Sequence, residues 1–285
     1  MKVHHANEVT GQSSSDPLAA DESWLDLSNP ARQADGIVVF VHGYLDCPEA
    51  WQLVADAMRW PGWRKVAVGL RPARLASSSG ETLMSYAGQV LDTIARVRTS
   101  VDVPVVVVGH SMGGQIAELA ARELGNRLAG LALITPAPLA GCPLPDVQMA
   151  AFRQRAAQPD EAVARAGKLA RSTHLPDDGL NLLVQSTLAT PTSLVIEQLE
   201  AWTGGHSSGN EHSRVEVPVI VIATTDDGVF TPEFLARHVA ARFTNCQFQV
   251  VRDSGHWPHL EQPAAVATHL HDFITRLSRT AKAVR

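Results

Sequence analysis

Short apolar runs alternate with longer segments of helical periodicity along most of this sequence. Apolar runs with few polar interruptions are typical of strands that are buried on both faces of a parallel sheet. Segments in which apolar residues recur every three to four positions predict amphipathic helices. The alternation therefore predicts an α/β fold, with a mostly parallel, doubly wound sheet and helices on both of its faces. Strands are expected at residues 24–27, 37–40, 65–70, 105–108, 127–134, 217–223 and 246–251, and helices from Pro48 to Met58, Thr82 to Arg98, Gln115 to Arg122 and Leu260 to Leu277, the last with Pro263 in its first turn.

A stretch of about eighty residues between Thr135 and Val217 has no strand pattern. Helices are expected here from Asp146 to Ala157, from Asp160 to Arg171 and from Thr192 to Trp202, followed by a loop over 203–210. We expect residues 139–213 to form a helical cap that covers a site on the sheet and excludes water from it. The alternative is that these helices only pack on the body of the fold.

Chain length and hydrophobic content indicate how the chain is divided into domains. The chain has 285 residues, of which 45% are hydrophobic, enough for one large core with a small inserted lobe. The core is expected to comprise residues 21–138 and 214–285. Residues 1–20 are rich in Ser, Asp, Asn and Ala and carry few large apolar side chains, so we expect them to be disordered.

Charge and hydropathy exclude several classes of partner. The net charge is −5, and no basic run with interleaved aromatic residues suggests a nucleic-acid surface. No apolar stretch reaches the roughly 18 residues that a membrane-spanning helix needs. The N-terminal residues lack the apolar segment of a signal peptide, so we expect a cytoplasmic protein. A small-molecule substrate is the expected partner, and both a monomer and a homodimer are compatible with the sequence.

One strand leads directly into a motif that carries chemistry. The apolar run 105–108 continues into Gly109-His110-Ser111-Met112-Gly113, and a helical pattern follows. A sharp turn from strand to helix needs residues without bulk on either side of its apex, which explains Gly109 and Gly113. The apex residue, Ser111, is then exposed at the N-terminus of a helix, where backbone N–H groups can stabilise an oxyanion.

Three other motifs accompany predicted strands, the first two directly after apolar runs and the third a few residues past the run 247–251. They are Val41-His42-Gly43-Tyr44, Thr224-Thr225-Asp226-Asp227-Gly228 and Gly255-His256-Trp257-Pro258-His259-Leu260-Glu261-Gln262-Pro263. Together with the serine motif, and in this order, they resemble the α/β-hydrolase family over roughly residues 36 to 275. The resemblance implies an α/β-hydrolase fold with a helical cap inserted after strand 6. It also implies a longer N-terminal β-hairpin than this chain provides.

The serine, the aspartate and the histidine of these motifs form a chemically complete set. A serine hydroxyl needs a base to take its proton, and histidine, with an ordinary pKa of about 6.5, suits that role. A carboxylate on the second ring nitrogen fixes the tautomer and stabilises the imidazolium. Because reactive groups gather at the carboxyl ends of parallel strands, we expect Ser111, Asp227 and His256 to meet at one edge of the sheet.

Two of these assignments have alternatives. The acid is either Asp226 or Asp227, and the family's Gly-x-x-Asp pattern, with Thr224 in the glycine position, favours Asp227. The base is either His256 or His259. His256 follows the glycine as in the family, whereas His259 is expected to be a partly exposed residue at the start of a helix.

Backbone N–H groups are the expected oxyanion donors. One belongs to Met112, which follows the nucleophile, and the other to Tyr44, which follows the His-Gly pair. His42 is expected to hold this loop rather than to act as a catalyst. The residues proposed to line the substrate pocket are His42, Leu45, Trp202, Val229 and Trp257.

No metal or organic cofactor is expected. The three cysteines, Cys47, Cys142 and Cys246, are widely spaced and odd in number, which predicts free thiols. His206 and His212 lie in a polar loop, where solvated histidines are expected in preference to a metal site.

A serine nucleophile forms an acyl-enzyme, so hydrolysis of a carboxylic ester, lactone or thioester of a small, mainly apolar substrate is the primary hypothesis. The same residues are compatible with hydrolysis of a carbon–carbon bond in a diketone from aromatic degradation. A cofactor-free oxygenase or perhydrolase and a non-catalytic sensor of a small ligand are the remaining alternatives.

Overall fold

The computed structural model describes residues 24–28, 34–60, 62–73, 77–98, 100 and 102–283. The disorder expected for residues 1–20 therefore concerns a segment outside the described residues. Seven strands form one sheet in the order β1-β3-β2-β4-β5-β6-β7. All neighbouring strands are parallel except β1, which pairs antiparallel with β3. The strands are β1 (Trp24–Asp26), β2 (Gly36–Val41), β3 (Trp63–Val68), β4 (Val105–His110), β5 (Gly130–Ile134), β6 (Val219–Thr224) and β7 (Cys246–Val251).

The sheet separates two hydrophobic cores. Along β2, Ile37, Val39 and Val41 contribute to one core, whereas Val38 and Phe40 contribute to the other. This alternation follows from the opposite directions of successive side chains in a strand. Because both faces are covered, the central strands contain almost no polar residues, which is why their apolar runs were visible in the sequence.

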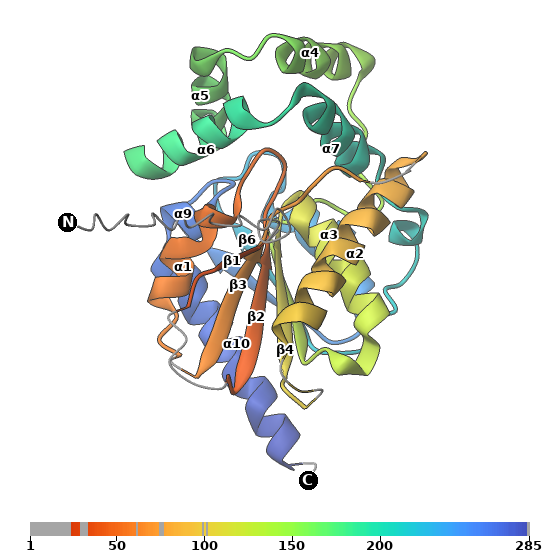
Figure 1. The fold of residues 1–285 in the computed structure, drawn as a ribbon, viewed down its shortest axis with the longest axis vertical. Coiled ribbons are helices and arrows are strands. Elements are labelled where there is room, and N and C mark those ends of the chain that lie inside the picture. Colours follow the sequence, from red (N-terminus) through yellow and green to blue (C-terminus); the bar gives the residue numbers. More distant parts are fainter. Residues whose placement is uncertain are drawn as a thin grey trace, which may run out of the picture.

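Helices cover both faces of the sheet, as the predicted doubly wound fold requires (Figure 1). Residues of α2 (Ser79–Val97), α3 (Met112–Leu124) and α8 (Pro232–His238) pack into the first core. Residues of α1 (Gln52–Ala57) and α10 (Pro263–Ala283) pack into the second core. Short 3₁₀ turns at Pro48–Trp51, Gly125–Arg127, Ser207–Asn210 and Ala240–Arg242 complete the connections.

The closing helix differs from the prediction. Instead of one helix from Leu260 to Leu277, the chain forms α9 (Pro258–Glu261) and then α10, which begins at Pro263. Gln262 separates them with φ −135° and ψ 54°, outside the helical region. A residue that precedes proline is disfavoured in the helical region, which explains the break.

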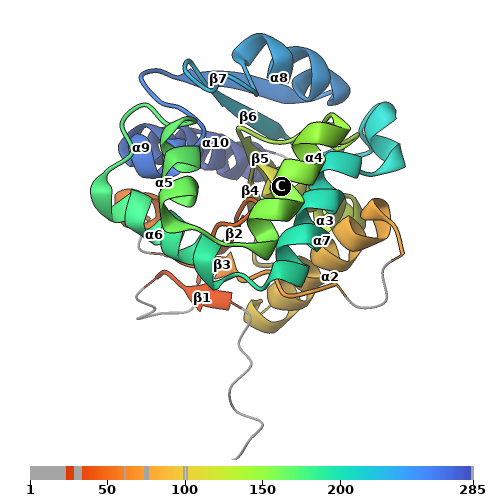
Figure 2. The ribbon, with the colours of Figure 1, turned by 90° about the horizontal axis from the view of Figure 1, so that it is seen from above.

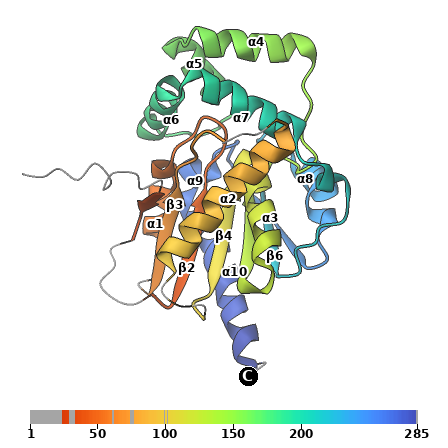
Figure 3. The same cartoon turned by 45° about the vertical axis from the view of Figure 1, so that its right-hand side comes forward.

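Four helices lie between β5 and β6 and cross above the end of the sheet (Figures 1 and 3). They are α4 (Asp146–Ala157), α5 (Glu161–Leu169), α6 (Asp177–Ala189) and α7 (Thr192–Gly204). Seen from above, they spread over the ends of the strands (Figure 2). This segment follows the fifth strand, and not strand 6 as the resemblance implies, since only β1 precedes β2 in the described part of the chain.

Two details of this segment were predicted incorrectly. Helix α6 was missed, although Leu180, Leu183 and Val184 are buried at helical spacing. The segment after Trp202 was expected to be loop, but α7 continues to Gly204 and a 3₁₀ turn follows. None of the helices among the described residues is long and apolar enough to cross a membrane.

Candidate active site

Ser111 occupies a strained turn between β4 and α3. Its backbone has φ 52° and ψ −121°, a conformation that residues other than glycine rarely adopt. A Cβ atom on Gly109 would lie 2.2 Å from the carbonyl oxygen of Gly113, and one on Gly113 would lie 2.3 Å from the carbonyl oxygen of Val41. Only glycine fits at these two positions, so the local sequence holds the serine at the apex of the turn.

Ser111, His256 and Asp227 form a continuous hydrogen-bonded chain. His256 Nε2 lies 3.0 Å from Ser111 Oγ, and His256 Nδ1 lies 2.5 Å from Asp227 Oδ2. Ser111 follows β4, Asp227 follows β6 and His256 follows β7, so the sheet brings together side chains that are far apart in the sequence. All three are buried, with residue exposures of 8% for the serine, 3% for the histidine and 1% for the aspartate.

The two candidate acids have different surroundings. Asp227 Oδ1 accepts hydrogen bonds from the backbone N–H groups of Val229 and Phe230, which leaves Oδ2 for the histidine. Asp226 is exposed, and its Oδ2 accepts a hydrogen bond from Thr173 Oγ1 at 3.1 Å. The geometry therefore favours Asp227 over Asp226 as the partner of His256.

Burial and charge set the protonation of the pair. Burial and the positive charge of Arg171 lower the pKa of His256 to about 3, so the ring is neutral at neutral pH. Burial alone would raise the pKa of the Asp227 carboxyl, but His256, Arg171 and the Val229 N–H hold that pKa well below its usual range. A neutral base next to an ionised carboxylate is the state in which the histidine can accept a proton from the serine.

Two backbone N–H groups lie beside the serine loop. Met112 is the first residue of α3, so its N–H has no acceptor within the helix. Tyr44 follows Gly43 in the loop after β2, and a Cβ atom on Gly43 would lie 3.0 Å from the Cβ of Ser111. The glycine lets this loop approach Ser111 closely, which is a geometry that an oxyanion site requires.

A cavity of about 490 Å³ opens at Ser111 and His256. Its remaining walls come from the loops of the core and from all four helices α4–α7. Of the predicted pocket residues, Leu45, Trp202, Val229 and Trp257 line this cavity, together with Tyr44. His42 does not, which corrects its place among the pocket residues. Its Nδ1 lies 2.9 Å from the carbonyl oxygen of Gly43, and its Nε2 accepts a hydrogen bond from the Leu70 N–H at 3.4 Å, so the ring holds the loop.

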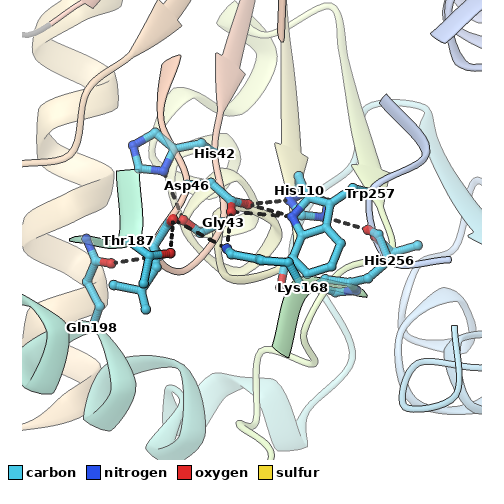
Figure 4. Close-up of polar contacts among 12 residues, drawn as sticks. His42, Gly43, Asp46, His110, Lys168, Thr187, Gln198, His256 and Trp257 are labelled. Carbon is cyan, nitrogen blue, oxygen red and sulfur yellow. Dashed lines mark hydrogen bonds and ion pairs between the residues drawn. The ribbon is translucent and has the colours of Figure 1, made fainter. Parts of the chain in front are cut away.

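Sequence reasoning missed the charged residues that line this cavity, among them Asp46, Lys168 and Arg171. Asp46 and Lys168 form a buried ion pair at 3.1 Å (Figure 4). Arg171 Nη2 lies 3.7 Å from Asp227 Oδ1, and Arg171 Nε and Nη2 have no hydrogen-bond partner among the described residues. Asp46 could have been found from its place in the loop after His-Gly. No pattern in the sequence marks Lys168 or Arg171 as residues of the cavity.

Three other histidines contact an aromatic ring or a hydroxyl group. His259 was expected to be partly exposed, but only 1% of its surface is accessible and its ring stacks on Trp51 at 4.6 Å. His206 and His212 bond to different hydroxyl groups, those of Ser208 and Thr244. The described part of the chain contains no group of three or more His, Cys, Asp or Glu residues that could hold a metal ion.

The cysteines are unpaired, as predicted. Cys47, Cys142 and Cys246 are all free and half-buried. Burial raises the pKa of the Cys47 thiol to about 12, with a further contribution from Glu49, so this thiol is protonated at neutral pH.

Comparisons with known proteins agree on the architecture. A family model described as "Alpha/beta hydrolase family" matches residues 38–269. Similar solved structures include a thermophilic esterase from Thermogutta terrifontis, with 18% identity and a TM-score of 0.69 over 89% of this chain and 93% of that chain. An esterase from Exiguobacterium antarcticum has 16% identity and a TM-score of 0.74, over 88% and 94%. An enol-lactonase from Burkholderia xenovorans has 18% identity and a TM-score of 0.71, over 88% and 95%. No match was found among curated proteins.

Proposed function

The chain belongs to the alpha/beta hydrolase family, and we propose that it is a serine hydrolase that cleaves a carboxylic ester, lactone or thioester through an acyl-enzyme. The observation that carries this proposal is the hydrogen-bonded chain from Ser111 Oγ through His256 to Asp227. Esterases and an enol-lactonase among proteins of the same fold agree with this reaction class.

In the proposed mechanism, Ser111 Oγ attacks the substrate carbonyl while its proton passes to His256 Nε2. Asp227 accepts the hydrogen bond from His256 Nδ1 and stabilises the imidazolium that forms. The leaving alcohol takes the proton from His256, and an acyl-Ser111 ester remains. A water molecule, deprotonated by His256, then attacks this ester. The bond between the acyl carbon and Ser111 Oγ breaks, Oγ takes the proton back from His256, and the acid is released.

The negative charge that develops on the carbonyl oxygen needs donors that are already in place. We assign this role to the backbone N–H groups of Tyr44 and Met112. Removing one such donor costs roughly 3 to 4 kcal/mol of transition-state stabilisation in comparable sites. A side-chain substitution cannot remove a backbone donor. The contribution of these donors can therefore be tested only by changing residues that hold the two loops in place.

We further propose that residues 139–213 act as a cap over this site. The support is that α4–α7 all contribute to the cavity wall, so a substrate bound at Ser111 would be enclosed by them. Most of the wall is apolar, with contributions from Phe152, Val195 and Trp202, which favours a mainly apolar substrate of modest size.

The test is hydrolysis of p-nitrophenyl esters of increasing acyl length by the wild-type protein and by Ser111→Ala. We expect turnover by the wild type, its loss in the variant, and labelling of Ser111 by a fluorophosphonate. Labelling of Ser111 without ester turnover would indicate a substrate other than these esters, and diketones would be tested next. A folded wild type that is not labelled would contradict the mechanism and favour a ligand-binding role.

A further inference from the structure

A single buried carboxylate connects the loops around the candidate active site. The side chain of Asp46 is only 2% exposed. The Trp257 indole Nε1 donates to both of its oxygens, at 3.3 and 3.2 Å, and Lys168 Nζ lies 3.1 Å from Oδ1. His110 Nδ1 lies 3.3 Å from Oδ2. Figure 4 shows the side chains of His110, Trp257 and Lys168 around this carboxylate, with dashed lines for the contacts.

Each contact on the core side is adjacent in sequence to a group of the proposed mechanism. His110 precedes Ser111, Trp257 follows His256, and Asp46 itself lies two residues after Tyr44. The carboxylate therefore joins the end of β4, the loop after β7 and the loop after β2. These are the segments that carry the nucleophile, the base and one oxyanion donor.

The same carboxylate reaches the helices above the cavity through Lys168 of α5. Lys168 Nζ also lies 3.5 Å from the Leu45 carbonyl oxygen and 4.9 Å from the centre of the Trp257 ring. Leu45 is held on its other sides as well. Its N–H donates to Gln198 Oε1 of α7 at 3.4 Å, and its oxygen accepts from Thr187 Oγ1 of α6 at 3.5 Å.

These contacts compensate for an unfavourable backbone. Leu45 has φ 57°, a left-handed conformation that costs free energy for any residue other than glycine, so surrounding contacts must maintain it. Burial alone would raise the pKa of the Asp46 carboxyl, but Lys168 and His110 hold that pKa well below its usual range, so the group is a carboxylate. An ionised acceptor makes stronger hydrogen bonds than a neutral one, which suits a role in fixing geometry.

We propose that Asp46 is a positioning residue of the proposed hydrolase, which holds the Tyr44 loop, Ser111 and His256 in register and ties them to α5 through Lys168. This inference rests on the proposed function. The competing role is that Asp46 only neutralises the buried Lys168. The two roles differ in what happens when the lysine is absent.

The decisive comparison is made in a Lys168→Met background, where no buried cation is left to neutralise. If Asp46 positions the three loops, Asp46→Leu added to K168M lowers kcat by on the order of 10- to 100-fold, since small displacements of reacting groups have effects of this size. KM changes little, because the cavity wall is largely retained. Asp46→Asn in the same background restores much of kcat, since its amide oxygen can still accept the hydrogen bond from Trp257.

A second buried ion pair provides a matched control. Glu118 and Arg242 lie 2.8 Å apart, with side-chain exposures of 3% and 11%. The double variant Glu118→Leu/Arg242→Met removes a comparable pair that touches none of the proposed mechanistic groups. It is expected to change Tm and to leave kcat at the wild-type value.

Three results would overturn the inference. The first is a D46L/K168M protein with the kcat of K168M. The second is an equal loss of kcat in the Glu118/Arg242 control. The third applies if D46L/K168M does not fold. Trp257→Phe removes the indole donor, together with part of the ring, and is expected to lower kcat. A wild-type kcat in this variant would contradict the role.

The inference also has a test that does not need turnover. If the wild type is not labelled at Ser111, the proposed function fails by itself. Crystal structures of K168M and D46L/K168M then decide the positioning role. Displaced or disordered Tyr44, Leu45 and Trp257 in the double variant support it, and unchanged positions overturn it.

Discussion

The substitution Asp227→Asn should invert the hydrogen bonding of the base. Asp227 Oδ1 accepts from the N–H groups of Val229 and Phe230, at 3.0 and 3.2 Å, whereas Oδ2 faces His256 Nδ1. In the variant, the amide oxygen must stay with the two backbone donors, so the amide NH₂ turns toward His256. A donor then faces Nδ1, and the histidine must move its proton to Nε2.

This tautomer cannot accept the proton of Ser111, because Nε2 already carries one. Loss of the correct tautomer in a comparable triad costs about 10⁴-fold in kcat, equivalent to ~5.4 kcal/mol of transition-state stabilisation. Stability should fall much less, since asparagine has nearly the same volume and keeps its two backbone hydrogen bonds. We expect kcat for a p-nitrophenyl ester to fall by about this factor while Tm changes only slightly.

The neighbouring residue supplies the control. Asp226→Asn removes the same charge one position away, from an exposed side chain that bonds to Thr173 instead of His256. It should retain wild-type kcat. The reasoning is refuted if D227N stays within about tenfold of the wild type, or if D226N loses as much activity as D227N.

Three further predictions follow from the same geometry. Burial and the positive charge of Arg171 together lower the pKa of His256 to about 3. Arg171→Gln should therefore raise that pKa and shift the acid limb of the kcat/KM pH profile to higher pH. Gly113→Ala should lower Tm and expression strongly, because the new Cβ would lie 2.3 Å from a backbone oxygen of β2. The lowered pKa of Asp46 contributes stability that is complete above its unfolded value of about 3.9 and is lost as pH falls through the folded value. Thermal unfolding should therefore show a steeper acid decline for the wild type than for D46L/K168M.

The sequence predicted the features that depend on local order along the chain. Ser111 and Asp227 could be proposed as site residues because each follows a buried strand, and parallel strands bring their carboxyl ends to one edge of the sheet. Glycines without room for a Cβ mark the serine turn in the sequence itself. These signals need no knowledge of how distant segments pack.

The features that were missed depend on packing between distant segments. Lys168 lies on an amphipathic helix with charged neighbours, and only the position of that helix over Asp46 makes it a buried partner. His259 was expected to be partly exposed because it begins a short helix, yet Trp51 covers its ring. No periodicity in the sequence records such contacts, because they are set by the angle at which helices cross the sheet.

The backbone of His256 shows how the loop that carries the base is fixed. Its carbonyl oxygen lies 2.8 Å from His110 Nε2 and accepts a hydrogen bond from Thr135 Oγ1 at 3.0 Å, which ties it to the ends of β4 and β5. Its N–H donates to the Arg171 carbonyl oxygen at 2.7 Å, in the segment that follows α5. Glycine at position 255 allows this approach, since a Cβ atom there would lie 2.4 Å from the same oxygen. His256 is therefore bonded both to the sheet and to the segment after α5, so it cannot follow a movement of one without losing bonds to the other. A displacement of α5 would therefore reach His256 directly, through the chain at Arg171, as well as through Asp46.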